Sequence, residues 1–277
     1  MKWVVGVDLR PGCYGALGFA RFLAERVGDT ATAVHAVQLP DLLDQPPSQA
    51  EVRDHVERFV QERLDKAGVQ VAHDVDPDEA LHAAVTEQGA DGIIIGRRSP
   101  ADGDEVVRLG AVARRILRHL GHPVLVCPAD LKADAVADGP VMLAAVPAEQ
   151  CVGALRFAQG LARRLGRPLE VVAAVRPAFG SSVSYLPAPA YQGSLFERAQ
   201  AELTAWLDAH GAGDCSATVV EGTTVPVILG EADARQAVAI VCGSRRLSVV
   251  DRIFQSSIGG VLAGTARVPV AVVPPEA

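Results

Sequence analysis

Short apolar runs rich in β-branched residues recur along the chain, and segments with helical spacing separate them. The run 93–95 is three consecutive isoleucines, which is the composition of a strand buried on both faces. Segment 50–67 instead spaces its apolar residues as a helix does, at Val52, Val56, Phe59, Val60 and Leu64. Strands that alternate with helices in this way predict a parallel sheet with helices on both faces and right-handed crossovers.

The pattern predicts nine elements in each half of the chain. In the first half, strands are expected over 3–8, 32–38, 69–75, 92–95 and 123–127, and helices over 14–27, 50–67, 77–88 and 105–120. In the second half, strands are expected over 141–146, 169–175, 216–221, 238–242 and 269–273, and helices over 149–165, 194–210, 225–235 and 251–264.

The two halves are copies of one another. Residues 15–28 (GALGFARFLAERVG) and 153–166 (GALRFAQGLARRLG) are identical at nine of fourteen positions, at an offset of 138. The offset is 147 between Gly96 and Gly243, so the second copy carries an insertion, which we place at 176–193. We therefore predict domains over 1–128 and 140–277, joined by a polar surface linker over 129–139.

Composition restricts the function classes. The net charge of −7 and a pI near 5.5 argue against a nucleic-acid-binding protein, which usually has a basic face. No apolar stretch approaches 18 residues and no signal peptide begins the chain, so we expect a cytoplasmic protein without a membrane span. The five cysteines form no C-x-x-C pair, which favours inert thiols and no metal site.

Two segments combine a strand, a glycine, a polar loop and a helix. They are 91–111 and 238–257, and this arrangement can bind an anion because the free N–H groups of the helix point at the loop. Each loop holds two adjacent arginines, Arg97 and Arg98 in the first copy and Arg245 and Arg246 in the second. They either clamp an anion or are solvated and paired with nearby acidic residues.

The chain resembles the universal stress protein family in its tandem form. The resemblance is carried by VVGVD at 4–8, His35 at the end of the second strand, ADGIIIG at 90–96 and HPVLV at 122–126. It implies an α/β fold of two five-stranded, flavodoxin-like domains with strand order 3-2-1-4-5, paired through their last strands. It further implies that ATP-binding members carry G-x2-G-x9-G-[ST] after the fourth strand, with an Asp at the end of the first strand contacting the adenosine.

The first copy meets this motif in part. Asp8 stands at the Asp position, although it can alternatively cap the following helix. Gly96 matches the first Gly, Ser99 replaces the second, and ten residues rather than nine precede Gly110. Ala111 stands where the motif has a hydroxyl.

The second copy meets other parts of the motif. Pro147 is taken as the residue at the Asp position, and it has no hydrogen-bonding side chain. Gly243 is present, Arg246 replaces the second Gly, and the serines at 256 and 257 replace Gly-[ST]. The combined nucleotide-binding candidates are Asp8, Gly96, Arg97, Arg98, Ser99, Gly110, Gly243, Ser244, Arg245, Arg246, Ser256 and Ser257.

Three functions remain open. The first is a stress-response regulatory protein with degenerate nucleotide sites, which acts through an unidentified protein partner. The second is a switch that binds ATP or another adenine nucleotide in the first copy. The third is a carrier of another anionic or apolar ligand that uses the insertion, which is alternatively a lid on its own domain. No GxxxxGK[ST], GxSxG or HExxH motif is present, so we expect no enzyme and no catalytic residue. A homodimer of the tandem chain is left open.

Overall fold

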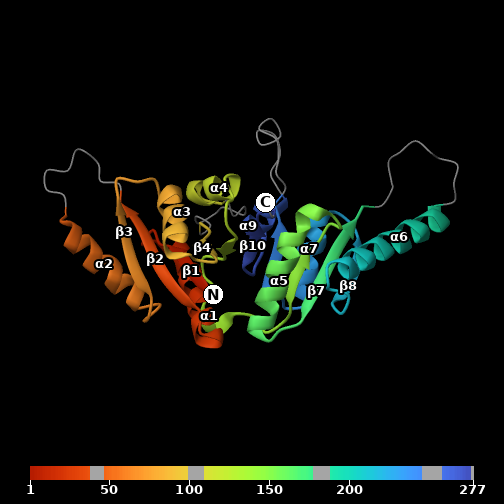
Figure 1. Cartoon of the computed structure of the whole chain (residues 1–277), viewed down its shortest axis with the longest axis horizontal. Helices are drawn as coiled ribbons and strands as arrows, with labels where there is room; N and C mark the ends of the chain where they lie inside the picture. The colour runs from red at the N-terminus through yellow and green to blue at the C-terminus, as the bar shows by residue number, and fades with distance from the viewer. Residues whose placement is uncertain (38–46, 99–108, 177–187, 245–257, 276–277) are drawn as a thin grey trace.

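The computed structural model describes residues 1–37, 47–98, 109–176, 188–244 and 258–275, with the backbone alone at 188–194. Figure 1 shows the two halves side by side. The first half is built from β1 (Lys2–Gly6), η1 (Pro11–Cys13), α1 (Tyr14–Val27), β2 (Thr30–Val37), α2 (Gln49–Gln61), β3 (Gly68–His73), α3 (Pro77–Gln88), β4 (Gly92–Gly96), α4 (Ala111–Arg118) and β5 (Val124–Cys127).

A short helical turn, η2 (Ala133–Ala135), lies in the linker. The second half is built from β6 (Val141–Ala144), η3 (Glu149–Cys151), α5 (Val152–Leu165), β7 (Leu169–Val175), α6 (Ala188–Ala209), β8 (Ser216–Glu221), α7 (Thr224–Ala234), β9 (Ala239–Gly243), α9 (Ile258–Thr265) and β10 (Val270–Val273). The alternation of strands and helices expected from the sequence is confirmed.

All ten strands form one sheet. Their order is β3-β2-β1-β4-β5-β10-β9-β6-β7-β8, so each half has the expected 3-2-1-4-5 order. Pairing is parallel within each half, and β5 and β10 are antiparallel with Val126 opposite Val270. The halves are therefore joined through their last strands, as the resemblance implied.

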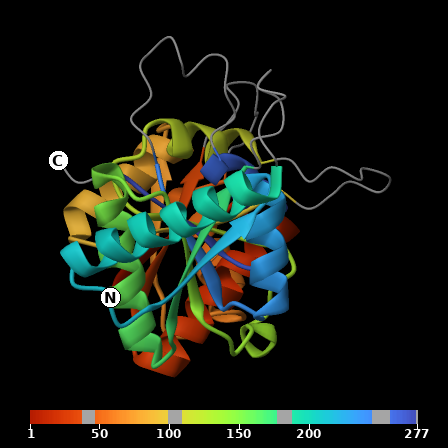
Figure 2. The ribbon, with the colours of Figure 1, turned by 90° about the vertical axis from the view of Figure 1, so that its right-hand side faces the viewer.

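Two helical layers cover this sheet, and β4 explains why. Ile94 packs into the core under α1, α2, α5 and α6, whereas Ile93 and Ile95 pack into the core under α3, α4, α7 and α9. All three side chains are buried, which confirms a strand covered on both faces. Figure 2 shows α6 lying across one face of the sheet at its outer end, where it packs on β8 and β7.

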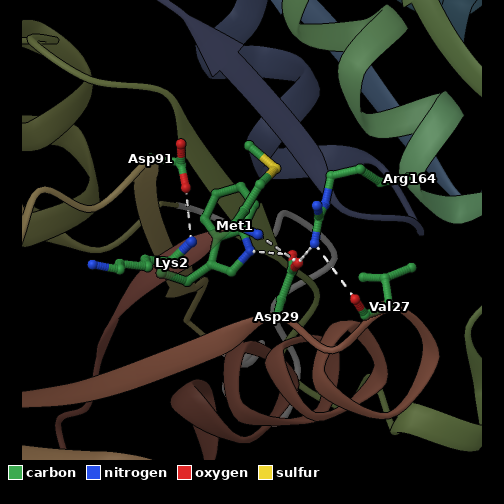
Figure 3. A network of polar contacts seen from close by, with 7 residues as sticks. Met1, Lys2, Val27, Asp29, Asp91 and Arg164 are labelled. Carbon is green, nitrogen blue, oxygen red and sulfur yellow. Dashed lines mark hydrogen bonds and ion pairs between the residues drawn. The ribbon is translucent and has the colours of Figure 1, made fainter.

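A polar cluster ties the first helix layer of one half to that of the other (Figure 3). The carboxylate of Asp29 is buried and accepts a hydrogen bond from the indole Nε1 of Trp3 at 2.8 Å. It also pairs with the amino group of Met1 and with the guanidinium of Arg164, which extends from α5. Trp3 meets Phe157 of α5 edge-on, with ring centroids 6.5 Å apart. Apolar and charged contacts therefore both cross between the halves.

The linker is less exposed than its composition predicted. Ala129 is buried, and its carbonyl accepts a hydrogen bond from the Gly15 N–H at 2.9 Å. A Cβ atom on Gly15 would lie 1.6 Å from the Pro128 carbonyl oxygen, and one on Gly18 would lie 2.2 Å from that of Leu131. Both glycines are thus needed for the linker backbone to lie against α1.

Several predicted helix ends were wrong. The second helix ends at Gln61, six residues before the expected end. The helix expected from 105 begins at Ala111, because Gly110 is extended with φ −60° and ψ 164°. The start of the helix expected from 251 lies outside the described residues, and its described part begins at Ile258. Helix α6 begins at Ala188 rather than at 194, so the last residues of the predicted insertion, 188–193, form the first turns of α6. The rest of the insertion, including Phe179 and Tyr185, lies outside the described residues.

Candidate functional site

Asp8 lies just beyond β1, at the carboxyl edge of the first half, and its side chain is exposed. Its Oδ1 accepts a hydrogen bond from the Arg10 N–H at 3.1 Å, which closes a turn. The residue inside that turn, Leu9, has φ +59°, a conformation that costs a non-glycine residue about 1–2 kcal/mol. Neither η1 nor α1 receives a side-chain cap, so the alternative that Asp8 caps the following helix was wrong.

The thiol beside Asp8 is chemically quiet. Burial, and then the Asp8 carboxylate, raise the pKa of Cys13 to about 11. Burial likewise raises the pKa of Cys127, and it raises that of Cys242 to about 12. None of the five cysteines forms a disulfide. At neutral pH these three thiols are protonated, and a protonated thiol is a poor nucleophile.

Gly96 ends β4 and is pressed against the loop that follows β1. A Cβ atom built on it would lie 1.9 Å from the carbonyl oxygen of Gly12 and 2.9 Å from the Cα of Cys13. Close backbone packing therefore requires glycine at this motif position, whether or not a phosphate binds. The contact also holds η1 against the strand end, which brings the Asp8 loop to the start of the 96–110 loop.

The two loop arginines of the first half differ in what they contact. The Arg97 backbone N–H donates to the Cys127 carbonyl at 3.0 Å, and its Nη1 donates to the carbonyls of Gly264 at 3.2 Å and Ala266 at 2.6 Å. Burial lowers the pKa of this guanidinium. The sequence left Arg97 either as an anion clamp or as a solvated side chain. In the structure its guanidinium instead binds backbone carbonyls of the second half. Arg98 is exposed, and Ser99 lies outside the described residues.

Gly110 is the N-cap residue of α4 and leaves the helix N-terminus open. Among the described residues, which exclude 99–108, no side chain caps this terminus and no atom lies within 4 Å of the place where a Gly110 Cβ would be. The first N–H groups of an α-helix have no acceptor within the helix, and the helix dipole favours an anion beside them. Ala111 follows without the hydroxyl of the family motif.

His35 lies in β2, on the side of β1 away from β4, and its side chain bonds to the backbone. Its Nδ1 donates a hydrogen bond to the carbonyl oxygen of Val7 at 2.8 Å, which ties the end of β2 to the end of β1. The ring thus supports the turn that carries Asp8.

The second half places an apolar residue where the first places Asp8. The Ala145 N–H bonds to Val172 O, just as the Val7 N–H bonds to Val34 O, so Val146 corresponds to Asp8. The assignment of Pro147 to the Asp position was wrong by one residue; Pro147 corresponds to Leu9. Proline is fixed near φ −65° and cannot adopt the φ of +59° found at Leu9. The Asp8 turn therefore cannot form in the second half.

The remaining candidates of the second half are placed only in part. The Ser244 N–H donates to the Val273 carbonyl at 2.8 Å, so Ser244 takes the position that Arg97 has in the first half. At Gly243 the nearest atom to a built Cβ is the Cys151 Sγ, at 3.2 Å, which is a much looser contact than at Gly96. Arg245, Arg246, Ser256 and Ser257 lie outside the described residues.

A separate groove of about 590 Å³ lies between α1, the end of α2 and the linker. On one wall the Arg63 guanidinium stacks over the rings of Tyr14 and Phe59, at 4.5 and 4.1 Å from their centroids. The lining carries three basic and four acidic side chains, and Arg21 pairs with Glu25 within it. Sequence reasoning missed this groove, because its three walls are far apart along the chain.

Within the described ranges no three His, Cys, Asp or Glu side chains are grouped to hold a metal ion. Across the same ranges, no helix has the length and apolar character needed to cross a membrane.

A family model for the universal stress protein family matches residues 1–128 and 140–274. The chain belongs to that family. Among solved structures, a universal stress protein from Archaeoglobus fulgidus DSM 4304 is 19% identical with a TM-score of 0.66, and the match covers 99% of this chain and 98% of the other. A functionally unknown protein from Pseudomonas aeruginosa PAO1 is 16% identical with a TM-score of 0.69, covering 99% and 92%.

One structure of a universal stress protein in complex with cAMP matches 50% of this chain and 98% of its own, at 17% identity and a TM-score of 0.38. No curated protein matches the chain. The Archaeoglobus fulgidus and Pseudomonas aeruginosa structures, which match almost the whole chain, share the fold of this universal stress protein at low sequence identity.

Proposed function

We propose that this universal stress protein is a regulatory binding protein in which the first half alone accepts an adenine nucleotide. The observation that carries the proposal is that the exposed Asp8 carboxylate and the N-terminus of α4, which no described side chain caps, lie at the same edge of the sheet. Ligands of open α/β sheets bind at the carboxyl ends of the strands, where the winding reverses. In the 3-2-1-4-5 order that point lies between β1 and β4.

The chemistry of the two groups fits the two ends of a nucleotide. The Asp8 carboxylate accepts hydrogen bonds from ribose hydroxyls. The N–H groups at the start of α4 donate to a phosphate, and the open space at Gly110 lets the phosphate approach the backbone. His35 and Gly96 support this arrangement by holding the β1 turn in place.

The second half lacks the Asp8 anchor. Val146 is 43% exposed at the Asp position and has no hydrogen-bonding group. Pro147 prevents the turn that presents Asp8 in the first half. The proposed site is therefore single, although the fold is duplicated.

Binding without turnover is the expected behaviour. The buried thiol nearest to Asp8 is protonated at neutral pH, and His35 is engaged with a backbone carbonyl. Neither group is then available as a nucleophile or general base. The bound state would act through a protein partner, as a regulator does.

Isothermal titration calorimetry with ATP, ADP, AMP and cAMP tests the proposal. We expect one site per chain, with Asp8→Ala weakening the affinity about 10- to 100-fold, because a hydrogen bond to a charged group contributes about 1.5–3 kcal/mol. Val146→Ala, at the matching position of the second half, should leave the affinity unchanged. No heat with any of the four ligands, or full affinity in Asp8→Ala, would refute the proposed site. The degenerate, partner-only function would then be favoured.

A further inference from the structure

The antiparallel join places parts of one half beside the candidate site of the other. Because Val126 is opposite Val270, the segment that precedes β10 lies at the carboxyl end of β5. That segment follows the end of α9, so Gly264 in the last turn of the helix and Ala266 just beyond it lie nearby. The carboxyl end of β5 is also where β4 delivers Arg97, whose N–H bonds to Cys127.

Arg97 uses this proximity to close the C-terminus of α9. Its guanidinium donates to the carbonyl of Gly264, in the last turn of the helix, and to that of Ala266, directly after the helix end. The final carbonyls of a helix have no donor within it, and a cation beside them is favoured by the helix dipole. The half-buried Arg97 is therefore the C-terminal cap of a helix that belongs to the other half.

The reciprocal contact is absent from the described residues. By the same register, Val124 is opposite Val272, so the end of α4 lies beside the carboxyl end of β10. Ser244 takes the place of Arg97 there, and no hydrogen bond among the described residues joins its side chain to α4. The connection between the halves at this level runs from the first site to α9.

We propose that Arg97 couples the occupancy of the first site to the order of α9. In this proposal, which rests on the nucleotide site described above, a phosphate bound beyond β4 draws the guanidinium away from the Gly264 and Ala266 carbonyls. The last turn of α9 then loses its cap and opens more often. The first half senses the ligand, and the second half changes its surface.

Two features support a competition between phosphate and carbonyls. Arg97 directly follows Gly96 at the carboxyl end of β4, which is the same edge of the sheet as the proposed phosphate position at the start of α4. A guanidinium binds an anionic phosphate through charge-assisted hydrogen bonds, which are about twice as strong as those to a neutral carbonyl. Leaving two carbonyls is therefore compatible with a net gain for the bound state.

Hydrogen–deuterium exchange of the segment 258–268 tests the coupling. In the wild-type protein we expect ATP to accelerate exchange in the last turn of α9 about fivefold, which is within the range that a helix-end charge contributes. Arg97→Ala should exchange fast without ATP and show no further response to it. Arg163→Ala is the matched control, because its Nε donates to a helix carbonyl, that of Gln159, within α5. It should respond to ATP as the wild type does.

The outcomes separate this proposal from the proposed function. If calorimetry shows ATP binding but exchange in 258–268 is unchanged, or still responds in Arg97→Ala, the coupling is refuted and the nucleotide site stands. Tripolyphosphate serves as a second probe that lacks the nucleoside. If neither ATP nor tripolyphosphate binds, both the site and the coupling are refuted.

Discussion

Replacing Gly96 with alanine tests whether close packing or phosphate binding requires glycine at the end of β4. The added methyl carbon would lie 1.9 Å from the Gly12 carbonyl oxygen and 2.9 Å from the Cα of Cys13. Nonbonded heavy atoms pack best at about 3.5–4.0 Å, so η1 and β4 must separate by more than about 1 Å. Both obstacles are backbone atoms, so no side-chain rotation relieves the overlap.

The expected cost follows from this geometry. Inserting a methyl group into a packed interior costs about 1–3 kcal/mol, and the upper end applies where the backbone must move. We therefore expect Gly96→Ala to lower the free energy of unfolding by about 3 kcal/mol. Separation of η1 would also disturb Ala16 and Leu17, which follow it in α1 and are fully buried.

The repeat supplies a matched control at Gly243. There the nearest obstacle is the Cys151 Sγ at 3.2 Å, followed by the Gln150 carbonyl oxygen at 3.5 Å. A shift of a few tenths of an ångström relieves this contact, so Gly243→Ala should cost less than about 1 kcal/mol. The two variants make the same chemical change at corresponding positions of one sheet.

Urea unfolding followed by circular dichroism measures both variants, and equal slopes would allow the midpoints to be compared. A clear loss of stability in Gly96→Ala alone supports the packing explanation. Equal losses in both variants would contradict it. So would a fully stable Gly96→Ala protein that has lost ATP binding, because the glycine would then serve the phosphate alone.

Two further changes test the join between the halves and the contact of His82, in α3, with His122. Asp29→Ala removes the acceptor of the Trp3 indole N–H and of the Arg164 guanidinium, whose side chain is 38% exposed. A hydrogen bond to a charged group contributes about 1.5–3 kcal/mol, so we expect about 3 kcal/mol of destabilisation in the same urea assay; a loss below about 1 kcal/mol would show that the cluster does not hold the halves together. Burial, and then the nearby His122, lower the pKa of His82 below 6.5. The unfolded chain then binds the proton more readily, and stability is lost as the pH falls through 6.5 toward the folded pKa. His82→Gln should lose less stability than the wild type between pH 7 and 5, and identical pH profiles would exclude His82 as the cause.

The fold could be predicted because local patterns specify it. A run such as 93–95 is apolar and β-branched at every position, which is typical of a strand covered on both faces, and the internal repeat then predicts two similar units. The join through the last strands followed from the family resemblance and from the apolar character of 124–127 and 270–273. Helix ends were less predictable, because the start of α4 depends on the extended backbone of Gly110 rather than on apolar spacing.

The details of the site depended on strand register. The residue that ends β6 cannot be read from an apolar run that continues through Val146 into Pro147. The hydrogen bond from Ala145 to Val172 decides the correspondence with Asp8. A shift of one residue changes which side chain occupies the nucleoside position. It also reveals that Leu9 and Pro147 make different turns, which a comparison of side-chain chemistry alone does not show.

The role of Arg97 shows why a duplicated sequence need not give two equivalent sites. Its residue type and its position after Gly96 both favour an anion clamp, and neither contains information about α9. Only the antiparallel pairing of β5 with β10 brings the Gly264 and Ala266 carbonyls within reach. The same pairing presents the end of α4 to Ser244, whose side chain has no guanidinium. Within the described residues, the symmetric join therefore carries this contact in one direction, with Arg97 in the first copy and Ser244 at the matching position of the second.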